Sequence, residues 1–141
     1  MSPTHPLHVR VIGVVALGGA VGAMLRFGLS ELFPDSSTGF PWTIFAVNVV
    51  GCFALASLPA LPAVREHHLL PPLLGTGVLG GFTTMSTYAE QARALAASGR
   101  VVTAGVYVLG TLAACLLAVA AADRLSTLRE RREFDEEEGD Y

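Results

Sequence analysis

The sequence predicts an all-α integral membrane protein with four transmembrane helices. Of its 141 residues, 52% are hydrophobic and only 15% are charged. The charged residues lie near the two ends and in short segments between, and none occurs within 11–25, 36–64, 69–89 or 101–122. A helix that crosses a hydrocarbon core about 30 Å thick needs roughly 20 apolar residues. We therefore expect one membrane domain over 9–122, with helices at about 9–29, 41–62, 70–91 and 101–122.

The first predicted helix, 9–29, carries Gly18 and Gly22 four residues apart. Small residues at this spacing let two membrane helices approach closely, so we expect them to pack against a neighbouring helix. Arg26 lies about one turn from the end of this helix. Its guanidinium either extends to the membrane interface or places a positive charge at a water-filled mouth, and the sequence leaves both open.

The second predicted helix, 41–62, begins at Pro41-Trp42 and carries Asn48 in its apolar interior. Proline fits a first helical turn, and tryptophan favours the membrane interface. A carboxamide in hydrocarbon needs hydrogen-bond partners. Asn48 therefore either joins two helices or donates hydrogen bonds into a polar route, and the sequence weights the two equally.

The third predicted helix, 70–91, is rich in glycine and hydroxyl side chains between Gly75 and Tyr88. Glycine weakens a helix, so we expect this helix to break in the middle of the membrane. Irregular backbone at that depth must be buried in protein or line a polar cavity. Gly77 and Gly81 also repeat the small-residue spacing of the first helix. This pattern indicates tight packing beside a route for a small polar solute.

The fourth predicted helix, 101–122, places Thr111 and Cys115 on one face, with Tyr107 one turn earlier. The threonine hydroxyl either bonds its own backbone or lines a pore. Cys52 and Cys115 both lie in apolar helices, which favours buried thiols over a disulfide or a metal pair.

Outside the membrane domain we expect a short tail at 1–8 and a charged, partly disordered tail at 123–141. The arginine distribution favours cytoplasmic termini but leaves dual insertion open. No Asp or Glu falls inside a predicted helix except Glu90, at the end of the third. Proton-coupled transporters normally need a buried carboxylate, whereas hydroxyls, an amide and an arginine suit an anion. No nucleophile–base pair or phosphate loop indicates an enzyme, and nothing indicates a nucleic-acid partner.

Three segments of the sequence closely resemble the Fluc (CrcB) fluoride channels. They are Gly18–Phe27, Asn48–Phe53 and Gly80–Glu90, and the last contains the string Gly-Gly-Phe-Thr-Thr-Met-Ser-Thr. The resemblance extends from about Val9 to Ala122. It implies four-helix subunits that assemble as an antiparallel, dual-topology dimer with two fluoride pores and a broken third helix.

The resemblance also implies roles for individual residues. It assigns a sodium ion at the dimer centre to the backbone carbonyls of Gly80 and Thr83. It assigns the ion pathway to Arg26 at a vestibule, to Asn48, and to side chains near the break and on the fourth helix, namely Ser86, Thr87, Thr111 and Cys115. Met85 and Tyr88 lie on the same pathway, at positions where the family usually has phenylalanine.

The function implied is passive, fluoride-selective export across the plasma (inner) membrane, which confers fluoride resistance. The partner is either a second copy or a sister subunit that supplies the missing phenylalanines. A small four-helix multidrug exporter is the alternative from another class, and the lack of a carboxylate in the interior of the predicted helices weighs against it.

Overall fold

The computed structural model describes residues 6–36 and 39–138, and every regular element within those ranges is helical. The all-α class expected from the sequence is therefore observed. In chain order the elements are α1 (Pro6–Leu32), α2 (Trp42–Ser57), the short turns η1 (Leu58–Ala60) and α3 (Pro62–Glu66), the π-helical segment η2 (Pro72–Leu79), α4 (Gly80–Phe82), α5 (Met85–Ala97) and α6 (Val101–Glu138).

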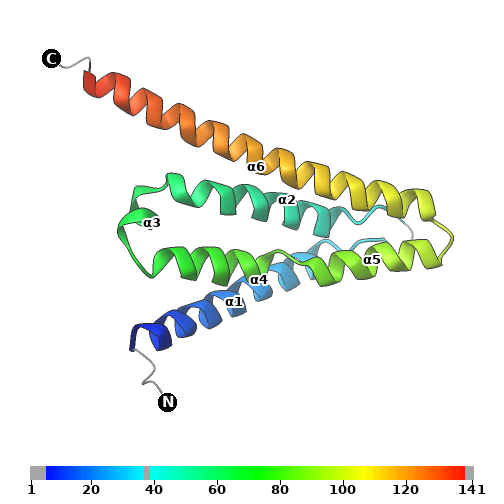
Figure 1. Ribbon diagram of the computed structural model, residues 1–141. Coiled ribbons are helices and arrows are strands. Elements are labelled where there is room, and N and C mark those ends of the chain that lie inside the picture. The colour runs from blue at the N-terminus through cyan, green and yellow to red at the C-terminus, as the bar shows by residue number, and fades with distance from the viewer. Residues whose placement is uncertain (1–5, 37–38, 139–141) are drawn as a thin grey trace.

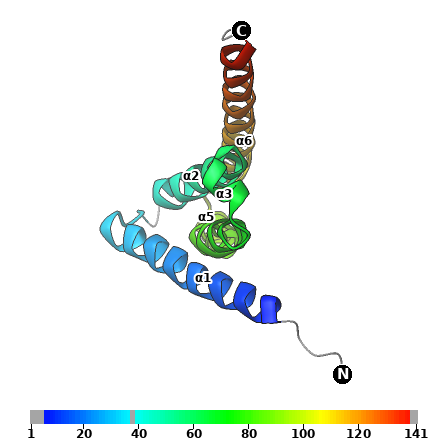
Figure 2. The ribbon, with the colours of Figure 1, turned by 90° about the vertical axis from the view of Figure 1, so that its left-hand side faces the viewer.

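The helices form an elongated bundle (Figure 1). α2 and the run from η2 to α5 lie side by side in opposite directions and are joined at one end through α3. α6 returns along α2 and α5, while α1 crosses obliquely and packs against η2 and α4 (Figure 2). The start of α1 and the end of α6 lie at the same end of the bundle.

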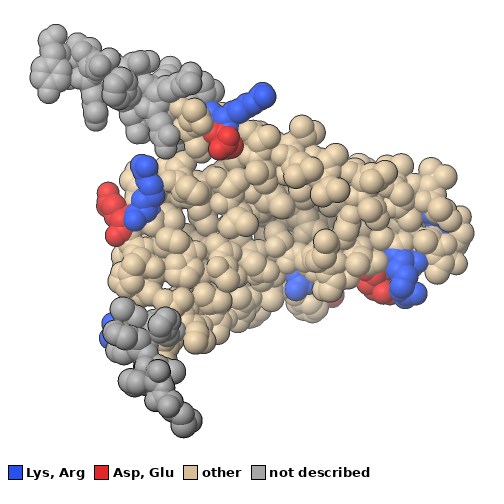
Figure 3. Space-filling view, in the orientation of Figure 1, with Lys and Arg blue, Asp and Glu red and all other residues tan. Residues whose placement is uncertain are grey.

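Three helical stretches in the described residues are long and apolar enough to cross a membrane: Val9–Leu32, Trp42–Ala60 and Val101–Thr127. Many of their large apolar side chains are exposed, including Met24 at 74% and Leu117 at 70%. Charged side chains gather towards the two ends of the face shown in Figure 3, and most of the surface between them is uncharged. An apolar exterior of this extent is suited to lipid rather than to water.

The predicted helix at 70–91 is not one continuous α-helix. Thr83 (φ −72°, ψ 156°) and Thr84 (φ −147°, ψ 124°) have extended backbone between α4 and α5. Because the helical run is divided there, this stretch is not among the three helices that are long enough to cross a membrane. The third predicted helix is thus interrupted at Thr83 and Thr84.

The helix ends differ from those expected. α1 extends to Leu32, past the predicted end at 29, and α5 continues to Ala97, past 91. α6 continues through Glu138, although the sequence predicted a helix end at 122 and a partly disordered tail. The segment 123–138 is rich in Leu, Arg and Glu, which are good helix formers, and oppositely charged residues recur at helical spacing. The tail predicted at 1–8 is shorter than expected, because α1 begins at Pro6. Residues 1–5 and 139–141 of the two predicted tails lie outside the described residues.

Candidate functional site

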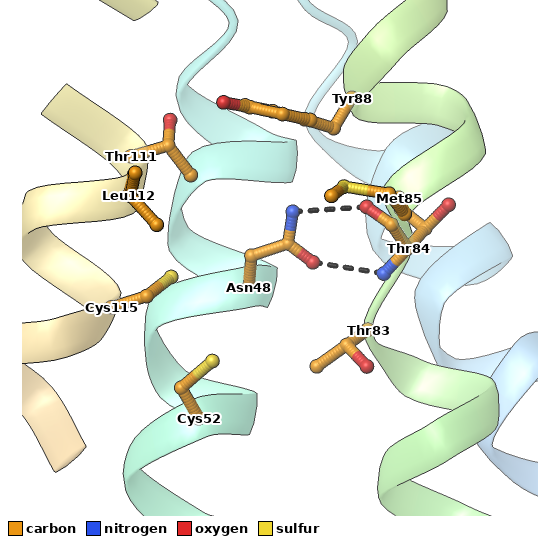
Figure 4. A pocket seen from close by; sticks show the side chains of 9 residues that line it. All are labelled: Asn48, Cys52, Thr83, Thr84, Met85, Tyr88, Thr111, Leu112 and Cys115. Atoms are coloured by element: carbon orange, nitrogen blue, oxygen red, sulfur yellow. Dashed lines mark hydrogen bonds between the residues drawn. The ribbon is translucent and has the colours of Figure 1, made fainter. Parts of the chain in front are cut away.

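Asn48 on α2 holds the extended backbone between α4 and α5. Its Nδ2 donates to the Thr84 carbonyl oxygen at 3.1 Å, and its Oδ1 accepts from the Thr84 N–H at 2.8 Å (Figure 4). The side chain therefore pairs with Thr84 as a neighbouring strand would. An amide nitrogen carries two hydrogens, so one N–H of Asn48 remains for another acceptor. Of the two interpretations of Asn48, the clamp is thus observed, and a donor is left over.

Thr84 begins α5 as its N-cap. Its Oγ1 accepts from the Thr87 N–H at 3.1 Å, which satisfies one of the free N–H groups at the helix start. The same hydroxyl donates to Thr87 Oγ1 at 3.1 Å and lies 3.3 Å from Ser86 Oγ. The hydroxyls of the predicted pathway residues Ser86 and Thr87 are therefore gathered around Thr84, which sequence reasoning did not single out. The signal for it was present, because threonine is among the residues preferred at a helix N-cap.

A cavity of about 260 Å³ lies between α2, the break and α6 (Figure 4). Its nine lining residues contain no carboxylate, and they are Asn48, Cys52, Thr83, Thr84, Met85, Tyr88, Thr111, Leu112 and Cys115. The structure therefore brings together most of the residues predicted for the ion pathway. Arg26, Ser86 and Thr87 do not line this cavity.

Thr111 is the polar group of this cavity that lacks a partner. Its side chain is only 4% exposed, and its Oγ1 makes no hydrogen bond among the described residues. The back-bonding interpretation of this threonine is therefore wrong. A buried hydroxyl without a partner is costly, so its donor and acceptor sites favour binding of a small polar species.

Tyr88 lies across the cavity with its hydroxyl bound. The phenol donates to the Val108 carbonyl oxygen on α6 at 2.8 Å, and the ring lies 5.1 Å from that of Tyr107. Tyr107 is fully buried and donates to Gln91 Oε1 at 2.8 Å, which places it in the packing between α5 and α6. Met85, by contrast, is 77% exposed at the start of α5.

The glycines predicted for packing lie where α1 meets η2 and α4. A Cβ on Gly18 would lie 2.6 Å from the Leu73 carbonyl oxygen, and one on Gly77 would lie 3.1 Å from Gly18 Cα. Gly22 and Gly81 leave no room for a Cβ either, because each faces backbone atoms of the other helix. The absence of a side chain at these four positions allows the backbone of α1 to contact the backbone of η2 and α4.

The break also frees backbone carbonyls on α4. In a continuous helix the Thr84 N–H would donate to the Gly80 carbonyl, but here it donates to Asn48. The Gly81 carbonyl instead accepts from Arg26 Nε at 3.3 Å, a contact that neither interpretation of Arg26 included. The backbone of Thr83 is extended, so its carbonyl also leaves the helical pattern. The Gly80 and Thr83 carbonyls are hard oxygen ligands of the kind that suit a hard cation.

Comparison with known proteins finds a family whose sequences match this chain. A sequence model of the family described as CrcB-like protein, Camphor Resistance (CrcB), matches residues 13–122. A fluoride-specific ion channel, FluC 1 of Streptomyces coelicolor, is 49% identical over 111 residues, covering 77% of this chain and 72% of the relative. FluC 2 of Nocardia farcinica is 42% identical over 132 residues, covering 90% and 94%, and FluC of Paracoccus denitrificans is 45% identical over 107 residues, covering 76% and 86%. The family match includes every residue that lines the cavity.

Proposed function

This chain belongs to the CrcB-like family, and on that basis we propose that it is a passive, fluoride-selective channel. It is a multi-pass membrane protein, and we place it in the plasma membrane. Four transmembrane segments would span the bilayer, with the third broken in mid-membrane. There it exports fluoride that has accumulated in the cytoplasm and so confers fluoride resistance. No energy source is coupled to this flow.

The observation that carries this proposal is the cavity beside the break. It offers the buried hydroxyl of Thr111, which has no partner, and the second N–H of Asn48. Fluoride is small and strongly hydrated, so a selective pathway must replace its water with hydrogen-bond donors. A carboxylate would repel the anion, and none lines the cavity. These hydrogen-bond donors suit an anion. A cationic drug or a transported proton would find no carboxylate to bind in this cavity.

We further propose an antiparallel dimer with a structural sodium ion at its centre. The carbonyl oxygens of Gly80 and Thr83 would hold the ion, because the break removes these groups from the regular helical hydrogen bonding. Gly80 is exposed on the single chain, where a second copy has access to it. The ion would neutralise carbonyl dipoles that a membrane protein cannot leave unsatisfied.

The partner is either an identical chain or a sister subunit. The second form is favoured by Met85 and Tyr88, since methionine offers no aromatic edge and the Tyr88 hydroxyl is bound to α6. Aromatic ring edges carry partial positive charge that an anion can contact. A sister chain with phenylalanine at these positions would supply them.

Fluoride efflux from liposomes that contain only this chain tests the proposal. We expect fluoride to leave far faster than chloride from vesicles loaded with either potassium salt. Equal rates for the two halides would refute selectivity. No fluoride flux from this chain alone, restored by co-expression with a sister subunit, would select the heterodimer. Replacing sodium with N-methylglucamine during purification should lower the flux if sodium is structural.

A further inference from the structure

The only two cysteines of the sequence meet at the proposed ion pathway. Cys52 on α2 and Cys115 on α6 are both free thiols that line the same cavity (Figure 4). The helices that carry them, α2 and α6, pack against each other along the bundle. The sequence favoured buried thiols over a disulfide or a metal pair, because both residues fall in apolar segments.

The surroundings of this thiol pair select a class of ligand. No His, Asp or Glu lines the cavity, so a hard or borderline metal ion would find no set of preferred ligands there. The thioether of Met85 lines it too, which makes sulfur the prevailing metal ligand. Soft thiolate and thioether ligands favour Cu(I)-like ions. We propose that Cys52 and Cys115 form a two-coordinate site for a soft monovalent cation such as Cu(I) or Ag(I).

Binding changes the charge of the cavity. Two S–H bonds break, two sulfur–metal bonds form and two protons are released, so neutral thiols and one cation become a complex of net charge −1. This complex lies in the cavity that also holds Asn48 and Thr111. It fills space and repels an anion, so a bound soft metal ion should block the pathway. The block rests on the proposed function, whereas the binding does not.

Silver binding to the purified, fully reduced chain tests the site directly. In nitrate buffer, which avoids silver chloride, we expect one Ag(I) per chain by titration calorimetry, with two protons released and two thiols lost to a thiol reagent. Cys52→Ala and Cys115→Ala should each weaken binding by at least about a hundredfold, since one thiolate is then missing. Met85→Leu should change affinity less than tenfold. Wild-type affinity in either cysteine variant, or a Cys52–Cys115 disulfide in the isolated protein, would overturn the proposal.

The flux assay tests the coupling to the pathway. Silver nitrate should reduce fluoride efflux from wild-type liposomes at least about tenfold, because a unit negative charge near the ion opposes its passage. The double variant Cys52→Ala/Cys115→Ala should keep the same fractional flux with and without silver. Silver that binds without changing the wild-type flux would overturn the block. A chain that carries no fluoride fails the proposed function, and the calorimetry then still decides the metal site.

Discussion

Replacing Asn48 with aspartate separates the charge of this side chain from its size. One oxygen of the new carboxylate can still accept from the Thr84 N–H, which now donates to Oδ1 at 2.8 Å. The other oxygen takes the place of Nδ2 and faces the Thr84 carbonyl oxygen, where the present donor distance is 3.1 Å. One of the two clamp bonds is therefore kept and one becomes a repulsion between acceptors.

The magnitudes of the two consequences differ. Losing one hydrogen bond of this kind, and placing a carboxylate oxygen against the Thr84 carbonyl, lowers the free energy of unfolding by about 1–3 kcal/mol. A carboxylate about 4 Å from a fluoride ion opposes it by about 4 kcal/mol at an effective dielectric of about 20. That energy corresponds to roughly a thousandfold in rate. We therefore expect Asn48→Asp to abolish measurable flux while the protein remains folded.

Fluoride efflux from liposomes and thermal unfolding in detergent measure the two effects. Asn48→Ala is the matched neutral variant, because it removes both clamp bonds without adding charge. It should lose about 2–4 kcal/mol of stability by leaving the Thr84 N–H and carbonyl unpaired, yet keep more flux than Asn48→Asp. Flux within threefold of wild type in Asn48→Asp would refute the reasoning. Equal flux losses in Asn48→Asp and Asn48→Ala would mean that Asn48 acts through packing alone.

Three further substitutions test separate parts of the structure. Gly22→Ala places a Cβ against the backbone of η2 and should cost about 1–3 kcal/mol in thermal unfolding, whereas Gly105→Ala, inside α6 with nothing within 4 Å, should keep or raise stability. Thr111→Val removes a hydroxyl that has no partner, so stability should hold or rise while fluoride efflux falls several-fold; unchanged efflux would exclude a donor role. The double substitution Met85→Phe/Tyr88→Phe should raise efflux from liposomes of this chain alone, because it adds a ring edge at 85 and releases the ring at 88 from its bond to α6; equal or lower efflux would refute this.

The positions of most helices could be predicted from charge-free runs, since the bilayer fixes the apolar length that a helix needs. The interior of 41–62 and 101–122 was located in this way. The charged segment after 122 was not, because Leu, Arg and Glu can continue a helix even where the membrane no longer requires one. Hydropathy marks the end of the apolar part of α6 at 122, but the helix itself continues to Glu138.

The position of the interruption at Thr83 and Thr84 could not be predicted from the local glycine content. Gly80 and Gly81 are helical, and the extended residues follow them. The reason lies 36 residues away, because the Asn48 amide offers the Thr84 backbone a pair of hydrogen bonds that replaces the helical one. Such a long-range choice depends on how α2 is rotated towards α5. The meeting of Cys52 with Cys115 depends in the same way on the rotation of α2 and α6.

The two interpretations of Asn48 are therefore one mechanism. The bonds to Thr84 use one N–H and the carbonyl oxygen of the amide, and they fix the plane in which the second N–H must lie. A donor held in place before an ion arrives needs no reorganisation when it binds, which makes it more effective than a mobile one. The clamp thus orients the donor. The same pair of bonds holds the extended backbone that separates α4 from α5. A substitution that loosens Thr84 should for this reason reduce anion flux even when Asn48 itself is unchanged.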